Sequence, residues 1–485
     1  MTKQEQSLKD KTAKGLFWGG LSNGIQQLLG ITFGIALGRI LDAEDYGLVG
    51  MLTIFIAISG TIMDGGFVNA LINKKNVTHE DYNAVFWFSS ISGVVIYTVL
   101  FFCAPLIAQF YDNPKLINLS RVVLFCIFTG GLSVVHNAII LKEMQLKNKA
   151  KIDLISLLLA SITGLTFALS GFAYWALVIQ TLVYSSLLTI LRWYYTPWRP
   201  TFHFNFNPIG KMLSFSSKLF ITNIFQQVSS NIFSVFLGRF YNERQVGFYS
   251  QGQKWMSMGQ SIAGTTISGV AQPVLVQVIE NKDRQRHILR KMIRFGAFIS
   301  FPLMFGIAFI GEELIVITVG EKWLEAVPFL QLFCIWGAFR YIWILYTNLF
   351  ISHGKSNINM YGTIATCIVQ ILCVLLMIPF GVFPMVIVYL AVNFVTLIGW
   401  HYFIKRLIGL KYVDIIKDIT PFLVITSVVI AIAWFITKDI TNNYILISLK
   451  IIIVACLYLI IMWKSKARVF NDCIQFILKR KKQTE

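Results

Sequence analysis

Apolar runs long enough to cross a lipid bilayer recur along the whole chain, and they constrain its fold more than any other feature. A membrane-spanning helix needs about 20 mainly apolar residues, because the hydrocarbon core holds no water to satisfy the backbone of an open structure. A window of that length predicts fourteen spans, at 15–38, 47–71, 84–108, 119–141, 152–170, 172–195, 213–237, 248–273, 294–319, 327–350, 361–379, 383–403, 420–437 and 444–463. The sequence therefore predicts an all-α polytopic membrane protein.

The composition excludes the two other broad classes of protein. Apolar and aromatic residues make up 56% of the 485 residues and charged residues only 13%, whereas soluble domains have about 25% charged residues. Because this much apolar surface cannot stay hydrated, the chain is neither an ordinary soluble protein nor a disordered one. The first run follows a basic segment and has no signal-peptidase-like site, so we interpret it as a retained helix.

The net charge of +19 is divided unevenly between the two sets of connections that alternate along the predicted spans. Nearly all of the excess Lys and Arg lies on the set that includes both termini. Because such loops stay on the cytoplasmic side, both termini are predicted to be cytoplasmic. Topology and attraction to anionic membrane lipids explain the positive charge, so no nucleic-acid partner is needed.

An internal repeat divides the chain. A shift of 200 residues aligns eight identical positions, namely Asn23, Gln26, Gln27, Phe33, Leu37, Gly38, Arg39 and Gly47 with Asn223, Gln226, Gln227, Phe233, Leu237, Gly238, Arg239 and Gly247. Six spans per repeat give both copies the same orientation, the parallel arrangement that transporters place around a substrate path. We expect six-helix lobes at 1–198 and 199–410, two extra helices at 411–463 and a basic cytoplasmic tail at 464–485.

Polar side chains form a stripe on the first helix of each repeat. Asn23 and Gln27 lie one turn apart in helix 1, and the shift places Asn223 and Gln227 equivalently in helix 7. Since amides are costly in lipid, the stripes face either a neighbouring helix, through contacts between small residues, or water.

Helix 8 carries a longer hydrophilic face. Its members share one side of the helix, and they are Lys254, Ser257, Ser261, Thr265 and Ser268. The face predicts a water-filled cavity beside this helix.

Charged residues near the middle of the membrane each need a partner or an aqueous surface. Arg340, among aromatic residues of helix 10, either binds an anionic substrate or makes a structural cation–π contact. For Lys254, phosphate binding competes with snorkelling, and Asp64 is either a Na⁺ or H⁺ coupling site or part of an ion pair. Arg39 and Arg239, at the outer helix ends, are predicted interface anchors, with a cationic ring at the periplasmic mouth as the alternative.

Recognisable catalytic chemistry is missing. The six histidines are too dispersed for a local metal site, the cysteines show no CxxC spacing, and GxSxG and HExxH do not occur. Outer loops of about a dozen residues leave little room for an extracytoplasmic catalytic domain. We therefore expect no enzyme and no cofactor or metal, apart from Na⁺ or H⁺ if transport is ion-coupled.

Several motifs together carry a resemblance to a known family. They are DGGF at 64–67, VFWF at 85–88, GFAYWALV at 171–178, WRP at 198–200, LGRFYNERQVGFYS at 237–250 and GEKWLEAVPFLQ at 320–331. With these, the chain resembles the polysaccharide-transport flippases of the multidrug/oligosaccharidyl-lipid/polysaccharide (MOP) superfamily. It departs from their pattern at Lys142, where an arginine is expected, and at Gln272-Pro273, where Phe-Pro is usual.

The resemblance implies a V-shaped pair of lobes around a cationic cavity in a bacterial cytoplasmic membrane. It further implies that undecaprenyl-pyrophosphate-linked oligosaccharide is turned from the inner to the outer leaflet, with glycosyltransferases and a glycan polymerase as partners. A cation-coupled multidrug exporter of the same superfamily is the alternative. A membrane glycan polymerase or transferase is disfavoured by the repeat and the missing catalytic groups. A scaffold without transport is a third alternative.

Overall fold

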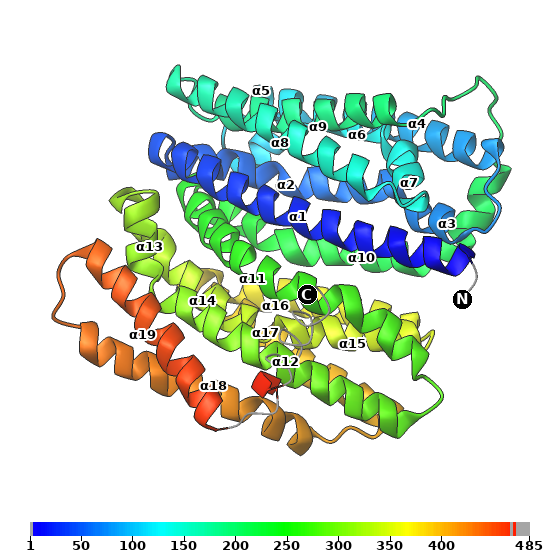
Figure 1. Cartoon of the computed structure of the whole chain (residues 1–485). Helices are drawn as coiled ribbons and strands as arrows, with labels where there is room; N and C mark the ends of the chain where they lie inside the picture. Colours follow the sequence, from blue (N-terminus) through cyan, green and yellow to red (C-terminus); the bar gives the residue numbers. More distant parts are fainter. Residues whose placement is uncertain (1–2, 466–468, 472–485) are drawn as a thin grey trace. The chain divides into compact units, whose positions relative to one another are not determined.

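The computed structural model describes residues 3–465 and 469–471, so most of the expected basic tail at 464–485 lies outside the described residues. The chain divides into two compact units, Met1–Ser250 and Gln251–Glu485. Helices make up nearly all of both units (Figure 1). The expectation of an all-α fold is confirmed.

The first unit contains ten helices and the beginning of an eleventh. They are α1 (Lys3–Ile40), α2 (Ala43–Asp64), α3 (Phe67–Asn73), α4 (His79–Tyr111), α5 (Leu116–Val123), α6 (Phe125–Gly131), α7 (Val134–Lys142), α8 (Leu146–Leu169), α9 (Trp175–Tyr195), α10 (Asn207–Phe240) and the start of α11 (Glu243–Gln277). Helix α8 packs against α1 and α9, while α10 packs against α2, α3 and α4. The first helix of the second repeat therefore belongs by its contacts to the first unit.

A double glycine interrupts the second span. Gly65 and Gly66 both have positive φ, 52° and 75°, and they separate α2 from α3. Glycine adopts this left-handed backbone without the steric cost of a Cβ. At the other end of α3, the Lys142 ammonium donates to the carbonyls of Leu71 (2.9 Å) and Lys74 (2.5 Å). The lysine at this departure from the family pattern thus caps a helix C-terminus.

A buried apolar cluster joins α3 to its neighbours. It includes Phe67 and Leu71 of α3, Phe86 of α4, and Ile209 and Met212 of α10. Because α10 contributes its first turns to this cluster, the break in the second span is packed against the start of the second repeat.

Two glycines related by the 200-residue shift make reciprocal contacts. A Cβ added to Gly47 of α2 would lie 1.7 Å from the carbonyl oxygen of Glu243, and one added to Gly247 of α11 would lie 1.9 Å from that of Ala43. Residues 43 and 243 are themselves related by the same shift. The starts of α2 and α11 therefore cross with their backbones touching, around a local two-fold relation.

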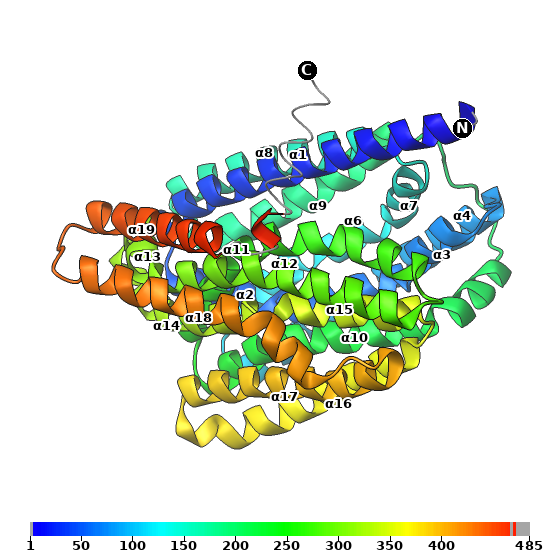
Figure 2. The same cartoon turned by 60° about the horizontal axis from the view of Figure 1, so that its bottom comes forward.

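The second unit contains the rest of α11 and the remaining helices. They are α12 (Lys282–Phe309), α13 (Gly311–Thr318), η1 (Glu321–Ala326), α14 (Val327–Gly337), α15 (Arg340–Ser352), α16 (Ser356–Met377), η2 (Ile378–Phe380), α17 (Val382–Ile408), α18 (Tyr412–Thr437) and α19 (Asn443–Lys464). Helices α16 and α17 lie side by side (Figure 2).

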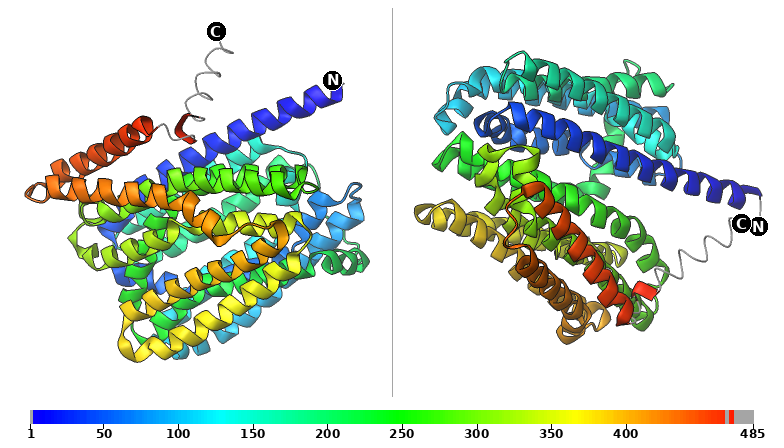
Figure 3. Two further views of the ribbon diagram at one scale, coloured as in Figure 1. Left: turned by 90° about the horizontal axis from the view of Figure 1, so that it is seen from below. Right: turned by 60° about the vertical axis from the view of Figure 1, so that its left-hand side comes forward.

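Ion pairs attach the last two helices to this unit. Near one end of α18, Asp418 accepts from Arg290 of α12, with Oδ2 2.7 Å from Nε and Oδ1 3.1 Å from Nη2. In α19, the buried Lys450 ammonium lies 2.6 Å from Glu313 of α13. Figure 3 shows α18 and α19, in orange and red, as a neighbouring pair.

The described helices include nine that are long and apolar enough to cross a membrane, or eleven when two bent pairs are each taken as one span. The bent pairs are Leu116–Gly131 with Val134–Lys142 and Glu321–Gly337 with Arg340–Ser352. Helices α1, α10 and α11 are not among the eleven, and they are the three in which the sequence predicts polar stripes. The chain is therefore a polytopic membrane protein.

Candidate functional site

A cationic polar face lies in the second unit, on α11 and at the start of α15. Arg340 follows the 41° bend between α14 and α15. Its Nη1 donates to Oε1 of Gln260 at 2.7 Å, and its side chain remains exposed. A guanidinium has five donors, so this single bond leaves capacity for a carboxylate or phosphate. Arg340 thus contacts helix 8 through Gln260, and its predicted role in binding an anionic substrate stays a prediction.

The same face of α11 includes other residues expected from the sequence. Lys254 and Ser261 are half-buried, and Ser257 is exposed. Their spacing with Gln260 places them along one side of the helix. The Ser261 hydroxyl donates to the carbonyl of Met258 at 2.8 Å. The side chains of Thr265 and Ser268 lie outside the described part of the structure.

Helix α11 begins five residues before the predicted span at 248–273. Lys254 consequently lies eleven residues into the helix that starts at Glu243. At about 1.5 Å per residue, this is roughly 16 Å along the helix axis from its start. The choice between phosphate binding and snorkelling for Lys254 stays a prediction. Arg340 and Lys254 together give the face two positive charges, which suit an anionic ligand carrying hydroxyl groups.

The amide stripes predicted for helices 1 and 7 occupy equivalent environments in the first unit. Asn23 and Asn223 are exposed, whereas Gln27 and Gln227 are half-buried. The neighbouring glutamines each donate to a serine four residues away along their own helix, but in opposite directions. These bonds run from Gln26 to Ser22 (2.9 Å) and from Gln226 to Ser230 (3.4 Å).

The arginines at the ends of α1 and α10 are exposed. Arg39 and Arg239 occupy the last turn of their helices. The Arg239 guanidinium carbon lies 5.6 Å from the ring centroid of Phe110, a cation–π contact of the kind expected for an interface anchor.

Asp64 lies at the break in the second span and interacts with backbone. Its Oδ1 accepts from the amide of Val68 at 3.3 Å, which satisfies a donor at the N-terminus of α3. Within the residues that the structure describes, Asp64 forms no ion pair, so the predicted structural partner on another helix is not found. The role of Asp64 in ion coupling stays a prediction. The described part of the chain also contains no group of three or more His, Cys, Asp or Glu side chains that could hold a metal ion.

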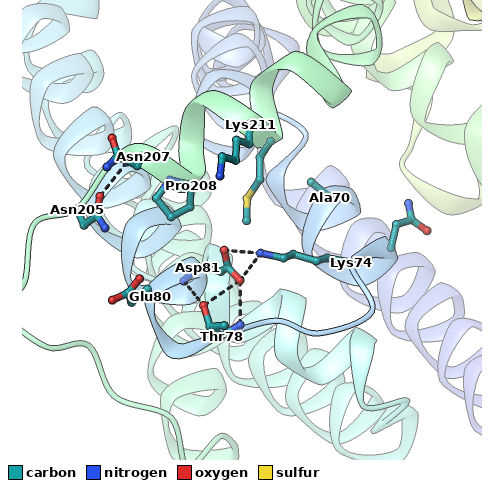
Figure 4. Close-up of a pocket in the computed structure, with 11 residues that line it drawn as sticks. Ala70, Lys74, Thr78, Glu80, Asp81, Asn205, Asn207, Pro208 and Lys211 are labelled. Carbon is teal, nitrogen blue, oxygen red and sulfur yellow. Dashed lines mark hydrogen bonds and ion pairs between the residues drawn. The ribbon is translucent and has the colours of Figure 1, made fainter.

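A polar pocket of about 550 Å³ opens in the first unit between α3, α4 and the start of α10 (Figure 4). Lys74 and Asp81 form an ion pair of 2.6 Å there, and Asp81 Oδ2 also accepts from the Thr78 amide at 2.8 Å. Lys211 of α10 lines the opposite side, with Asn205 and further polar side chains. Our sequence analysis missed this pocket, although Thr78-His-Glu-Asp81 is a recognisable capping-box pattern.

Comparisons with known protein families and sequences give the chain several relatives. A family model described as "Polysaccharide biosynthesis protein" matches residues 36–328. An "Uncharacterized membrane protein in cps region" of Klebsiella pneumoniae is 27% identical over 73% of this chain and 74% of its own length. The "Lipopolysaccharide biosynthesis protein WzxC" of Escherichia coli is 23% identical over 73% and 72%.

Solved structures share the fold at low sequence identity. The "Lipid II flippase MurJ" in an inward closed conformation matches with a TM-score of 0.76 and 13% identity, covering 94% of this chain and 99% of that one. A multidrug resistance MATE family transporter of the MOP superfamily, in an inward-facing conformation, matches with a TM-score of 0.61 and 14% identity, over 79% and 95%. The family model spans more than half of the chain and these structures share its fold, so the protein belongs to the polysaccharide biosynthesis protein family and has a MOP-superfamily fold.

Proposed function

We propose that the protein is a flippase for undecaprenyl-pyrophosphate-linked oligosaccharide repeat units. It carries them from the inner to the outer leaflet of the bacterial cytoplasmic membrane, for synthesis of O-antigen, capsule or exopolysaccharide. Family membership and the names of the relatives support the pathway. The observation that carries the mechanism is the exposed Arg340, held by Gln260 beside the polar face of α11.

A lipid-linked oligosaccharide meets a high free-energy barrier when it crosses the bilayer alone, and a flippase must supply the groups that lower this barrier. The pyrophosphate and the sugar hydroxyls would have to leave water without hydrogen-bonding partners. Arg340 and Lys254 are suited to the pyrophosphate, and the amides and hydroxyls of α1, α10 and α11 are suited to the sugars. The polyprenyl chain stays in lipid throughout, and alternating access exposes these groups to each side in turn.

The architecture in this proposal has fourteen spans. It adds α1, α10 and α11 to the eleven spans recognised by length and hydropathy. These three helices carry the polar residues that lower their hydropathy, as expected for helices that border water. Two parallel six-helix lobes at 1–198 and 199–410 then form a V, helices 13 and 14 follow at 411–463, and both termini are cytoplasmic.

The alternative is a cation-coupled multidrug exporter, since MATE transporters share the fold. The polar face of the second unit contains Arg340 and Lys254 and no carboxylate among the residues described on it, which favours an anionic cargo. Cells lacking the protein separate the two functions. Drug hypersensitivity with normal surface glycan supports the exporter, whereas lipid-linked repeats that accumulate facing the cytoplasm support the flippase.

Replacing Arg340 tests the mechanism. Losing a hydrogen bond to a charged group costs about 1.5–3 kcal/mol, so Arg340→Ala is expected to lower export by about 10- to 100-fold. Arg340→Lys keeps the charge without the planar guanidinium and is expected to retain part of the export. Surface glycan is measured in cells whose protein level matches wild type.

Arg406→Ala is the matched control for this experiment. Arg406 belongs to the same unit, and its guanidinium carbon lies 4.7 Å from the ring centroid of Tyr402. The Arg406→Ala substitution should leave export unchanged. Undiminished export by Arg340→Ala would remove Arg340 from the mechanism. A purified-protein assay with a fluorescent undecaprenyl-pyrophosphate glycan, with and without Na⁺ or H⁺ gradients, then tests coupling.

A further inference from the structure

The connector between α9 and α10, residues 196–206, forms neither helix nor strand, yet it is tied to α4. The buried Asn83 makes two of the bonds, with Nδ2 donating to the His203 carbonyl at 2.6 Å and Oδ1 accepting from the Thr201 amide at 2.9 Å. Trp87 Nε1 donates to the Thr201 carbonyl at 2.8 Å. The connector is therefore fixed along the first turns of a membrane-spanning helix (Figure 1, right-hand edge).

Alternate residues of this connector are exposed phenylalanines. Phe202 is 87% exposed, Phe204 is 56% exposed and Phe206 is 42% exposed. The rings of Phe202 and Phe204 lie against Trp87, with centroid distances of 5.5 and 4.7 Å. Apolar surface left in water costs about 25 cal/mol per Å², and loops in water are ordinarily polar. Three phenylalanines held outward by a fixed backbone therefore need an apolar environment.

The surface of α4 identifies this environment. From Trp87 onward, one side of the helix presents exposed apolar side chains at helical spacing, and they are Ile91, Val95, Val99, Phe102 and Leu106. In a membrane-spanning helix, such a stripe contacts the lipid hydrocarbon. Trp87 precedes Ile91 by one turn, so Phe202 and Phe204 lie at the end of the lipid-facing stripe. This is the depth at which aromatic residues gather in membrane proteins.

The other side of the connector is polar. Asn205 and Asn207, which alternate with the phenylalanines, line the pocket that also contains Lys74 and Lys211. Among the described residues, Lys211 has no ion-pair partner and is exposed. An ammonium group beside the interface matches the anionic headgroups of bacterial phospholipids.

From these observations, we propose that the connector is a membrane-interface element. Phe202, Phe204 and Phe206 insert among the lipids, while the Asn205 side contacts water and headgroups. The lipid bilayer is the occupant of this surface. Through its bonds to Asn83 and Trp87, the inserted connector holds the start of α10 beside α4. The proposal is independent of the transported substrate and applies in either orientation of the protein.

Site-directed spin labelling tests the alternation directly. Single cysteines at positions 202, 203, 204 and 205 are introduced into the full-length chain without its native cysteines and labelled with a nitroxide. The protein is placed in nanodiscs of phosphatidylethanolamine and phosphatidylglycerol, and collision rates with oxygen and with an aqueous nickel chelate are measured. We expect Phe202→Cys and Phe204→Cys to favour oxygen, and His203→Cys and Asn205→Cys to favour nickel.

Two reference sites set the scale, with Leu106→Cys for lipid and Asp439→Cys for water. Phe206→Cys provides another position on the apolar side if one of the first labels disturbs folding. Nickel-accessible labels at 202, 204 and 206 would show a connector in water and overturn the proposal. Labels at these positions that neither reagent reaches would instead indicate a protein partner or a second copy, and would equally overturn it.

Discussion

At the scale of single residues, Asp64 illustrates how a charged group in a membrane span can serve the backbone. The sequence leaves it between ion coupling and an ion pair, because hydropathy identifies a costly charge without identifying what it contacts. The structure shows that its carboxylate accepts from Val68 just after two glycines with positive φ. By contrast, Asn23 and Asn223, which the repeat aligns, are both exposed.

Substitutions at Asp64 separate its two remaining roles. Asp64→Asn keeps an oxygen acceptor for the α3 N-terminus, so we expect near-normal thermal stability and export. Asp64→Ala leaves the Val68 amide without its acceptor and should lower the free energy of unfolding by about 1 kcal/mol. The loss is measured as a lower melting temperature in detergent. If Asp64→Asn folds normally but abolishes export, the ionisable group itself is required and the coupling role is supported.

At the scale of elements, the crossing of α2 and α11 follows from two glycines that the repeat analysis aligned without explaining. Sequence identity at Gly47 and Gly247 marks equivalent positions, but it does not reveal that each one touches the backbone of the other repeat. Contacts of this kind depend on the packing of helices distant in sequence. The same reason explains why the Lys450–Glu313 pair and the Lys74–Asp81 pocket were not predicted.

Adding one methyl group to either glycine tests the crossing. Gly47→Ala and Gly247→Ala force a Cβ to within 1.7 and 1.9 Å of a carbonyl oxygen, so both should lower stability by about 1–3 kcal/mol. Gly60→Ala in the same α2 helix meets no atom within 4 Å and should be neutral or stabilising by up to about 1 kcal/mol. Thermal melts compare the three variants. Indistinguishable melting temperatures would contradict the close crossing.

At the scale of the whole molecule, sequence and structure divide the chain by different criteria. The repeat predicts a boundary at 198/199, which stays a prediction, whereas compact packing separates the units at 250/251. The difference arises because α10 starts the second repeat but packs on α2, α3 and α4. The all-α class and the three polar helices could be read from the sequence because they depend on composition and spacing. The family could be read because several motifs together carry its resemblance.

The uneven distribution of Lys and Arg predicts the orientation of the entire chain. Alkaline phosphatase fused after Asp439 should be active, because the connection between helices 13 and 14 is expected outside the cytoplasm. The same enzyme fused after Lys411, in a basic connection, should be inactive because it remains inside. Phosphatase activity per fusion molecule is measured in intact cells. The reverse pattern would invert the predicted topology and the direction of flipping with it.

The paired glycine contact has the pattern of a symmetric interface. In a symmetric interface between two identical chains, residue i of the first chain contacts residue j of the second, and residue i of the second chain contacts residue j of the first. A single sequence position then makes the same contact twice. Gly47 with Glu243 and Gly247 with Ala43 reproduce this rule inside a single polypeptide. Within one polypeptide the two glycines occupy separate positions of the sequence, so either can mutate without the other.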